Sequence, residues 1–434
     1  AAAQEQDSLL RVVAGLTQEK FYSLPKPPAQ GMSADSIVIA DFEMTGVLPK
    51  EKALLKDRLN IRYGQKMSKG DIDHLVAQLY GTQAYDFVTY ELKGKEDPFD
   101  LVFNCKKGPI HQFGLGVRAD TEEIVSVLLN IGYNAHKLHG HALDLTGKIS
   151  ANPYISFRWS YDMPKFPTVN ASASVRWTDL NMLNFGGNRL SFSLLNARQE
   201  VYLSNIKWNR LDIKGGLRNE VMNVRNVKSE QIIGDYDFSQ LSNDFVSLFA
   251  EADTYTFDDG YFPTKGIDAG LSYSWVFAGF PHRFNNFHIF RADAKVVVPG
   301  GERFAFIPSI DFRFLFGDEI PVAYFNAIGG SLAGRYVDQQ MPFIGVNHLS
   351  AMKNILTLFR TDFRYTLAKN HYITGILNYV RDCDHFKDYT VGLGYFGAGV
   401  EYSYDTIFGP LSANLHWSNM TNKIGFYISA GYNF

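Results

Sequence analysis

The feature of this 434-residue chain that most constrains its fold is a series of segments in which apolar and polar residues alternate. In the closing segment GFYISAGYNF, Phe426, Ile428, Ala430, Tyr432 and Phe434 fall on one side of an extended chain, and small or polar residues fall on the other. A strand of this kind at the end of a soluble sheet exposes an edge that invites unwanted pairing. In a closed barrel the last strand pairs on both sides, which removes that edge.

After Gly108 the whole chain follows this pattern. We count sixteen extended segments separated by Gly, Asn, Asp and Pro, an even number, as a single-chain bacterial barrel requires. Asp311 and Arg313 alternate away from the Phe-rich face of RFAFIPSIDFRFLF, and an Arg on a lipid-facing side costs about 2 to 4 kcal/mol near the midplane. The pattern predicts a mainly β fold, a 16-stranded antiparallel transmembrane β-barrel over residues 110–434.

Composition is consistent with a barrel without selecting it. No run of about 18 apolar residues is present to form a membrane helix, and the mean hydropathy is −0.15. Aromatic residues make up 15%, which suits the aromatic girdles of a barrel in contact with outer-membrane lipids, although an aromatic-rich soluble β-sandwich remains open on composition alone. The net charge of −3 gives no indication of a nucleic-acid partner. Cys105 and Cys383 match no metal-binding spacing, and we expect no metal and no cofactor.

Two further units precede the barrel. Leu9, Val12, Val13 and Leu16 recur at helical spacing, and a Pro-rich linker follows, so residues 1–33 are expected to form a helix and a linker. Residues 34–109 follow the order strand, two helices, two strands, which suffices for one small α+β domain. Within it, Ser68 and the acid three residues later form a capping box that starts the second helix.

The small domain carries a family resemblance. GQKMSKGDIDHLVAQLYGTQAYDFVTYEL resembles the second half of a POTRA domain, the periplasmic domain that precedes the barrels of the BamA-like outer-membrane assembly superfamily. The resemblance implies a bacterial outer-membrane location with the POTRA domain in the periplasm. A terminal aromatic residue also resembles the signal that outer-membrane assembly machinery recognises, with Phe426, Ile428, Tyr432 and Phe434 as its residues.

A loop between the eleventh and twelfth segments, GGSLAGRYVDQQMPFIG, carries a second resemblance. In this superfamily the corresponding loop folds into the lumen and carries a V-R-G-F or V-R-G-Y signature, whose Arg docks on the barrel wall. Here Gly334, Arg335 and Tyr336 present the Arg and Gly in transposed order. We expect Arg335 to dock through an ion pair, with Asp362 as its acceptor, and the alternative is an ordinary exposed loop charge. FPTKG, before the ninth segment, resembles another superfamily signature, or is simply a Pro/Gly turn.

The same loop also resembles that of one particular class of barrel proteins. GRYVDQQMPF, with Asp338 and Gln339, resembles the lid loop of patatin-like phospholipases that carry their own POTRA domain and barrel, the type Vd autotransporters and their Bacteroidetes relatives. A patatin needs a G-x-S-x-G elbow, and GLSYS and GGSLA do not match it, so this chain is not expected to be an enzyme.

Three functions follow as hypotheses. The first is that the barrel anchors, or both anchors and exports, a patatin-like passenger absent from this chain. The second is that it assembles or translocates client polypeptides, which the POTRA domain captures by β-augmentation; the short, Gly-bearing HQFGLGVRA would permit a weak junction between first and last strands. The third is a structural barrel or pore.

His136, His139 and His141 cluster in one turn, as the ligands of a metal site could. No clear fourth ligand accompanies them, so we interpret them as polar turn residues.

Overall fold

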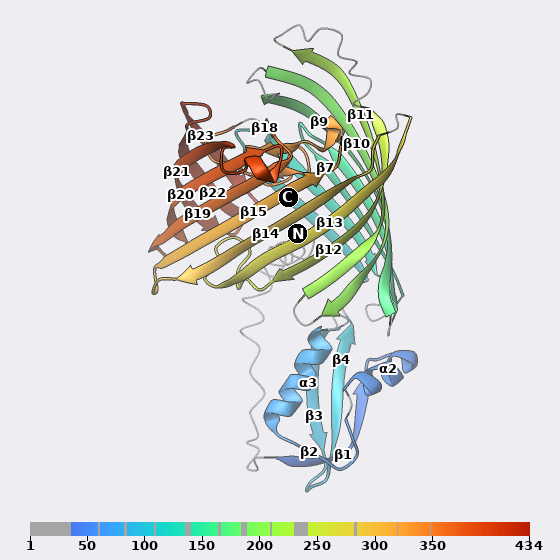
Figure 1. The fold of residues 1–434 in the computed structure, drawn as a ribbon. Helices are drawn as coiled ribbons and strands as arrows, with labels where there is room; N and C mark the ends of the chain where they lie inside the picture. The colour runs from blue at the N-terminus through green and yellow to red at the C-terminus, as the bar shows by residue number, and fades with distance from the viewer. Residues whose placement is uncertain are drawn as a thin grey trace.

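The protein consists of a small α/β domain and a closed β-barrel (Figure 1). The computed structural model describes residues 36–59, 61–81, 85–107, 110–134, 140–163, 166–183, 189–208, 211–229, 242–281, 284–318, 320–347 and 349–434. The helix and linker expected in residues 1–33 lie outside these ranges. Within them, no helix combines the length and the apolar character needed to cross a bilayer.

A four-stranded sheet and two helices form the small domain. Its elements are β1 (Ile37–Thr45), α2 (Pro49–Leu59), β2 (Gln65–Met67), α3 (Lys69–Gly81), β3 (Tyr85–Lys93) and β4 (Phe99–Lys107). The sheet order is β2-β1-β4-β3, with β1 and β4 parallel and both outer pairs antiparallel. The strand β2 was not predicted, because three residues are too few for alternation to be recognised.

The helices pack on the sheet through one apolar core. Its most buried members come from both layers: Ile39, Met44, Leu55, Ile72, Leu79, Leu101 and Phe103. The capping box of α3 is confirmed. The Ser68 backbone N–H donates to the Asp71 carboxylate at 2.8 Å, and the Asp71 N–H donates to Ser68 Oγ at 3.2 Å. Both of these otherwise unpaired donors are satisfied at the helix start.

Sixteen long strands close into an antiparallel barrel, which confirms the predicted architecture and strand number. They are β5 (His111–Asp120), β6 (Ile124–Asn134), β7 (Gly140–Ile149), β8 (Tyr154–Met163), β9 (Phe166–Leu183), β10 (Arg189–Trp208), β11 (Leu211–Ser229), β12 (Asn243–Tyr255), β13 (Gly266–Phe280), β14 (Phe287–Pro299), β15 (Phe304–Phe316), β19 (Ile355–Ala368), β20 (His371–Cys383), β21 (Leu393–Thr406), β22 (Gly409–Ser418) and β23 (Lys423–Gly431). A 3₁₀ turn, η3 (Phe386–Asp388), lies between β20 and β21. The junction of β23 with β5, which we call the seam, closes the ring.

Side chains alternate around the wall as the sequence indicates. On β13, Leu271, Tyr273 and Trp275 are exposed on the outer surface. On β15, Arg313 is buried on the inner side and donates to the Tyr324 carbonyl at 3.0 Å. The barrel therefore presents apolar residues to lipid and keeps charge in the lumen.

The strands differ greatly in length. β9, β10 and β11 have 18, 20 and 19 residues, whereas β5 has 10 and β23 has 9. β11 stays paired with β10 as far as Ser229. Val224 and Val227 both pack toward interior residues, because a β-bulge at Asn226, with φ +54, shifts the inward positions of β11 by one residue.

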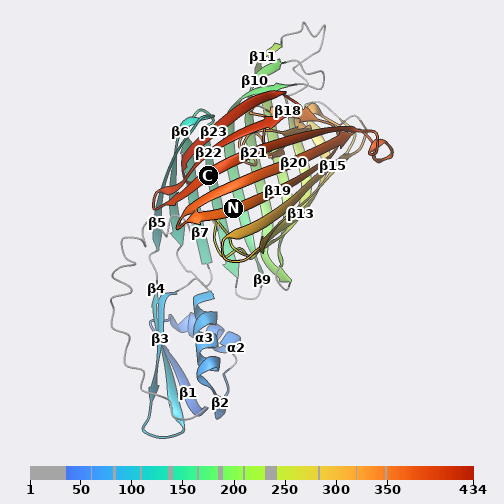
Figure 2. The same ribbon diagram turned by 90° about the vertical axis from the view of Figure 1, so that its left-hand side faces the viewer.

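A long segment between β15 and β19, residues 317–354 apart from 319 and 348, forms what we call the lid. It contains η2 (Val322–Tyr324), β16 (Asn326–Ile328), β17 (Gln340–Met341) and β18 (Leu349–Met352). β16 pairs with both β17 and β18, and β18 pairs with the end of β9. Met341 and Phe343 are fully buried against the wall residues Leu356 and Val380, so the lid packs on the inner wall. The small domain lies at the opposite end of the barrel from the start of β10 and the end of β11 (Figures 1 and 2).

Candidate functional site

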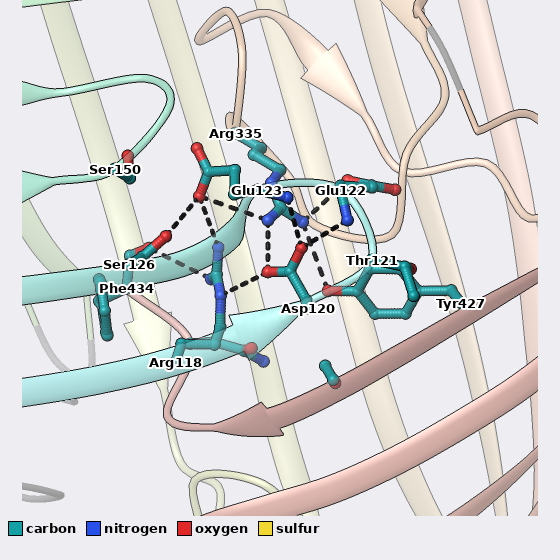
Figure 3. Close-up of polar contacts among 12 residues, drawn as sticks. Arg118, Asp120, Thr121, Glu122, Glu123, Ser126, Ser150, Arg335, Tyr427 and Phe434 are labelled. Carbon is teal, nitrogen blue, oxygen red and sulfur yellow. Dashed lines mark hydrogen bonds and ion pairs between the residues drawn. The ribbon is translucent and has the colours of Figure 1, made fainter.

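The lid arginine lies among the carboxylates of the turn between β5 and β6 (Figure 3). Its Nη2 donates to Asp120 at 2.5 Å and to Glu123 at 3.3 Å, and its Nη1 donates to Glu122 at 2.8 Å. Nη1 also donates to the Tyr427 hydroxyl of β23 at 3.3 Å. Arg335 is thus buried and contacts both strands of the seam.

A second arginine, Arg118 of β5, binds two of the same carboxylates. Arg118, 1% exposed, donates to Asp120 and to Glu123, each at 2.9 Å. Its Nη1 reaches the Phe434 carbonyl at 3.5 Å, and its guanidinium lies 5.4 Å from the centre of the Phe434 ring. Lys148 of β7 donates to Glu123 at 3.0 Å. We call Arg118, Asp120, Glu122, Glu123, Lys148 and Arg335 the seam cluster.

The seam cluster is electrically balanced. Its three cations face three carboxylates, and buried charges are tolerated only when they are paired in this way. Burial lowers the pKa of Arg335, but the carboxylates of Glu122 and Asp120 outweigh burial and raise that pKa above its usual range. The guanidinium therefore stays charged in the closed structure.

The seam itself is the shortest junction between neighbouring wall strands. Only Ser429↔Asp120, Ala430↔Ala119 and Gly431↔Arg118 pair β23 with β5, whereas β5 and β6 share ten residue pairs. The Thr121 N–H extends the junction with a bond to the Ile428 carbonyl at 3.1 Å. The register stops at Arg118, so no residue pair joins β23 to the stretch from Phe113 to Val117.

A backbone bend ends the last strand. Gly431 has φ +104, and a Cβ there would lie 2.3 Å from the Val117 carbonyl oxygen, so only glycine fits. Beyond it the chain leaves the wall, and Phe434 turns toward Arg118 (Figure 3). The expectation that Phe434 shares the outer face of Phe426 and Ile428 was wrong, because alternation ends at Gly431. Tyr432 donates its hydroxyl to the Ile407 carbonyl at 3.0 Å.

The acceptor predicted for Arg335 was also wrong. Asp362 lies on β19 and accepts two bonds from Arg360, at 2.8 and 3.0 Å. Alternation correctly assigned Asp362 to the inner face, but it gives no information on where around the circumference the lid lands. A signal for the true partners was present, since three carboxylates occur within the four residues that follow Arg118 and Ala119.

The other lid residues stabilise the lid's own turns or attach it to β9 and β10. Gly334, with φ +64, accepts a bond from Arg176 at 3.1 Å through its carbonyl. Asp338 pairs with Arg176 at 2.9 Å and with Arg198. Burial raises the pKa of Asp338, but these two arginines outweigh burial and hold that pKa below its usual range.

Two bonds stabilise the lid's own turns. The Tyr336 backbone N–H donates to Gln340 Oε1 at 3.0 Å, whereas its hydroxyl reaches out of the lid and donates to Glu122 at 3.4 Å. Gln339 donates to the Ala323 carbonyl at 3.1 Å.

The FPTKG turn docks at the other end of the lumen. The Phe262 ring stacks on Tyr372 with centroids 4.2 Å apart, and Arg364 donates to the Pro263 carbonyl.

Of the histidine cluster, His136 and His139 lie outside the described residues. His141 lies on the outer surface and accepts a bond from Trp159 Nε1 at 3.2 Å. In the part of the chain that the structure describes, no group of three metal-binding side chains occurs.

Together the geometry defines a class of protein: a sixteen-stranded membrane barrel with an internal lid fixed next to a short closing seam. The family model described as the OMP85 superfamily matches residues 153–434. The chain belongs to the OMP85 superfamily, which places it in the bacterial outer membrane.

Solved structures share this fold. BamA from Haemophilus ducreyi, in a form lacking POTRA domains 1–3, aligns with a TM-score of 0.64 at 15% identity over 92% of this chain and 85% of that chain. CdiB from Acinetobacter baumannii aligns with a TM-score of 0.54 at 12% identity over 92% of this chain and 74% of that chain. CdiB from Escherichia coli gives a TM-score of 0.50 at 10% identity over 99% of each chain. Among curated proteins, none matches the sequence.

Proposed function

We propose that this barrel assembles or translocates client polypeptides of the outer membrane at its seam. The observation that carries the proposal is the closing junction of three residue pairs beside a junction of ten. Each backbone hydrogen bond contributes only about 1 kcal/mol net, so a three-pair junction separates far more easily than its neighbours. Separation exposes a strand edge that can pair with an incoming strand.

The exposed edge of β5 is positioned to pair with a membrane-spanning strand of a client protein. β5 stays paired with β6 on one side, while its register with β23 covers only the last three of its ten residues. Phe113, Leu115 and Val117 are exposed on its outer face, at 69%, 53% and 52%. A client strand added here would continue both the ladder and the apolar outer surface of the barrel.

The lid favours a lateral route over an axial one. Met341 and Phe343 are buried against the wall, Arg335 fixes the lid at β5, and Asp338 fixes it at β9 and β10. An axial route would require breaking both sets of contacts. This arrangement also counts against a constitutively open pore.

The small domain acts, in this proposal, as a periplasmic POTRA domain that first receives the client. Its edge strand β3 has nine residues, long enough for β-augmentation. The alignment with BamA covers more of the chain than the barrel provides, which supports the assignment. The chain itself has no proposed enzyme activity. Anchoring of a patatin-like passenger stays a prediction from sequence, because residues 1–33 lie outside the described ranges.

A reversible cross-link tests the proposal. Cysteines at Ala119 and Ala430, a registered pair of outward residues, would lock the seam when oxidised. A matched pair at Ala413 and Ile428 would lock β22 to β23, an ordinary junction. In cells that depend on the variant, the locked seam should stop the folding of newly made outer-membrane proteins, and reductant should restore it. Normal folding with the seam locked would refute the proposal.

A further inference from the structure

The seam cluster holds together three parts of the molecule that are distant in sequence. Arg335 belongs to the lid, Asp120 ends the first barrel strand, and Tyr427 lies on the last strand (Figure 3). The Arg335 guanidinium donates to both strands at once. It is therefore a side-chain bridge across the seam as well as an anchor for the lid.

The bridge matters because the backbone junction is so short. Three residue pairs hold β23 to β5, and three side-chain hydrogen bonds support the same junction: Arg335 to Tyr427 at 3.3 Å, Arg118 to the Phe434 carbonyl at 3.5 Å and the Ile428 N–H to Thr121 Oγ1 at 3.4 Å. Hydrogen bonds from a charged donor are stronger than neutral ones. The side chains thus supply a substantial share of what closes the seam.

The same carboxylates anchor the lid and help to close the seam. Asp120 is a member of the seam register, opposite Ser429, and it also accepts from Arg335 and Arg118. Moving β5 away from β23 shifts Asp120 relative to the lid, and withdrawing Arg335 leaves Asp120 and Glu122 without their main cation. Opening the seam therefore weakens the Arg335–Asp120 ion pair, and breaking that ion pair weakens the seam.

The lid has a second, independent attachment. Asp338 pairs with Arg176 of β9 and Arg198 of β10, in the part of the wall that lies away from the seam. The lid can therefore release Arg335 while Asp338 still holds it to β9 and β10. A partial lid movement is sufficient for release.

We infer that Arg335 is a lock that couples the lid to the seam: the seam opens when Arg335 leaves Asp120, and a strand that displaces β23 releases the lid. The coupling is reciprocal, as any linkage between two equilibria must be. The importance of the lock for client handling rests on the proposed function, but the lock itself is a property of the resting barrel.

Spin-label distances across the seam test the lock directly. Nitroxides would be attached at cysteines replacing Ala119 and Ala430, in a full-length chain with Cys105 and Cys383 replaced by alanine and reconstituted in phospholipid vesicles. Arg335→Gln should raise the open-to-closed ratio about tenfold, within the range of ordinary coupling. Arg360→Gln is the matched control, because Arg360 also pairs with a lumen carboxylate but lies on β19.

Two more conservative substitutions keep the test decisive if Arg335→Gln does not fold. Tyr427→Phe removes only the hydroxyl that Arg335 reaches on β23, and Arg335→Lys keeps the charge but loses the forked geometry. Both should shift the ratio toward open, by less than Arg335→Gln. An unchanged distance distribution in these two variants, with the barrel shown to be folded by its heat-modifiable electrophoretic mobility, would overturn the lock.

The two proposals fail separately. If the distances respond to Arg335 but outer-membrane protein folding is indifferent to the Ala119–Ala430 cross-link, the lock stands and the proposed function falls. If folding requires an unlocked seam but the distances ignore Arg335 and Tyr427, the proposed function stands and the lock falls.

Discussion

Arg335 and Asp120 form an ion pair of 2.5 Å between the lid and the first barrel strand, although 215 positions separate them in the chain. Asp120 is at the same time one of the three residues of β5 that pair with the last strand. The lid therefore docks at the one junction of the wall that is held by the fewest residue pairs. This relationship motivates the tests that follow.

Removing the lid arginine should destabilise the barrel strongly. Arg335→Gln leaves three buried carboxylates with only Arg118 and Lys148, and loss of one partner of a buried pair costs about 3 to 5 kcal/mol. The temperature at which the barrel unfolds on electrophoresis should fall. Asp362→Asn should change it much less, because Asn keeps an acceptor for Arg360 and that pair is more exposed, at 25% and 12%, than Arg335 and Asp120, at 2% and 1%. Equal effects of the two substitutions would mean that lid docking does not depend on the seam cluster.

The neighbouring carboxylates Glu122 and Glu123 should behave in opposite ways. Burial raises the pKa of Glu122 above its usual value, and the ion pair with Arg335 offsets this only in part. Burial also raises the pKa of Glu123, but Lys148, Asn152 and Arg335 together outweigh it and leave the pKa below its usual value. A lowered carboxyl pKa contributes stability above the unfolded pKa, about 4.3, which is lost as pH falls through the folded pKa. A raised pKa means that ionisation opposes folding.

The measurement is urea unfolding of the barrel in vesicles at pH 7 and pH 3.5. Glu123→Gln should lower the free energy of unfolding at pH 7 by about 3 kcal/mol, and the difference from wild type should shrink at pH 3.5. Glu122→Gln should cost little at pH 7. A loss for Glu122→Gln as large as that for Glu123→Gln would contradict the assignment.

The bend at Gly431 should be intolerant of any side chain. Gly431→Ala forces a Cβ into a positive-φ backbone and against the Val117 carbonyl, with a strain of about 1 to 3 kcal/mol. We expect a weaker seam, measured as faster hydrogen exchange of the Thr121 amide that bonds to Ile428. Gly147→Ala is the control, because a Cβ there meets no atom within 4 Å. Equal exchange in the two variants would show that the bend does not support the seam.

The lid should limit ion flow through the lumen. Phe343 is fully buried, and Phe343→Ala in such a core costs about 3 to 5 kcal/mol, so the lid should lose its packing on the wall. Single-channel conductance in planar bilayers should rise over that of the wild type. Phe408→Ala, at an exposed turn residue, should leave conductance unchanged. A wild-type conductance as large as that of Phe343→Ala would favour an open pore.

The helix cap of the small domain gives a smaller, local prediction. Ser68→Ala removes the oxygen that accepts the Asp71 N–H, and loss of such a cap costs about 1 kcal/mol. Amide exchange in the first turn of α3 should be faster in the full chain. Ser68→Asp keeps an acceptor and should retain protection. Unchanged protection in Ser68→Ala would show that core packing, with Ile72 and Leu79, dominates the helix start.

The sequence by itself determined the barrel. A period of two is a local property of each strand, so the sixteen segments, their lipid and lumen faces and the inward position of Arg313 and Asp362 could all be predicted. The capping box at Ser68 is also local, since its donors and acceptors lie within three residues. Even the segment that forms the lid was located, because it interrupts the alternation.

Only the tertiary structure decided where these parts meet. Alternation assigns a residue to a face, but the wall must close before its circumference exists, and Arg335 then reaches Asp120 on β5 instead of Asp362 on β19. The end of β23 was decided in the same way, by the close approach of Gly431 to Val117 across the seam. Contacts between strands that are first and last in the chain have no local signature, and the proposed function depends on those contacts.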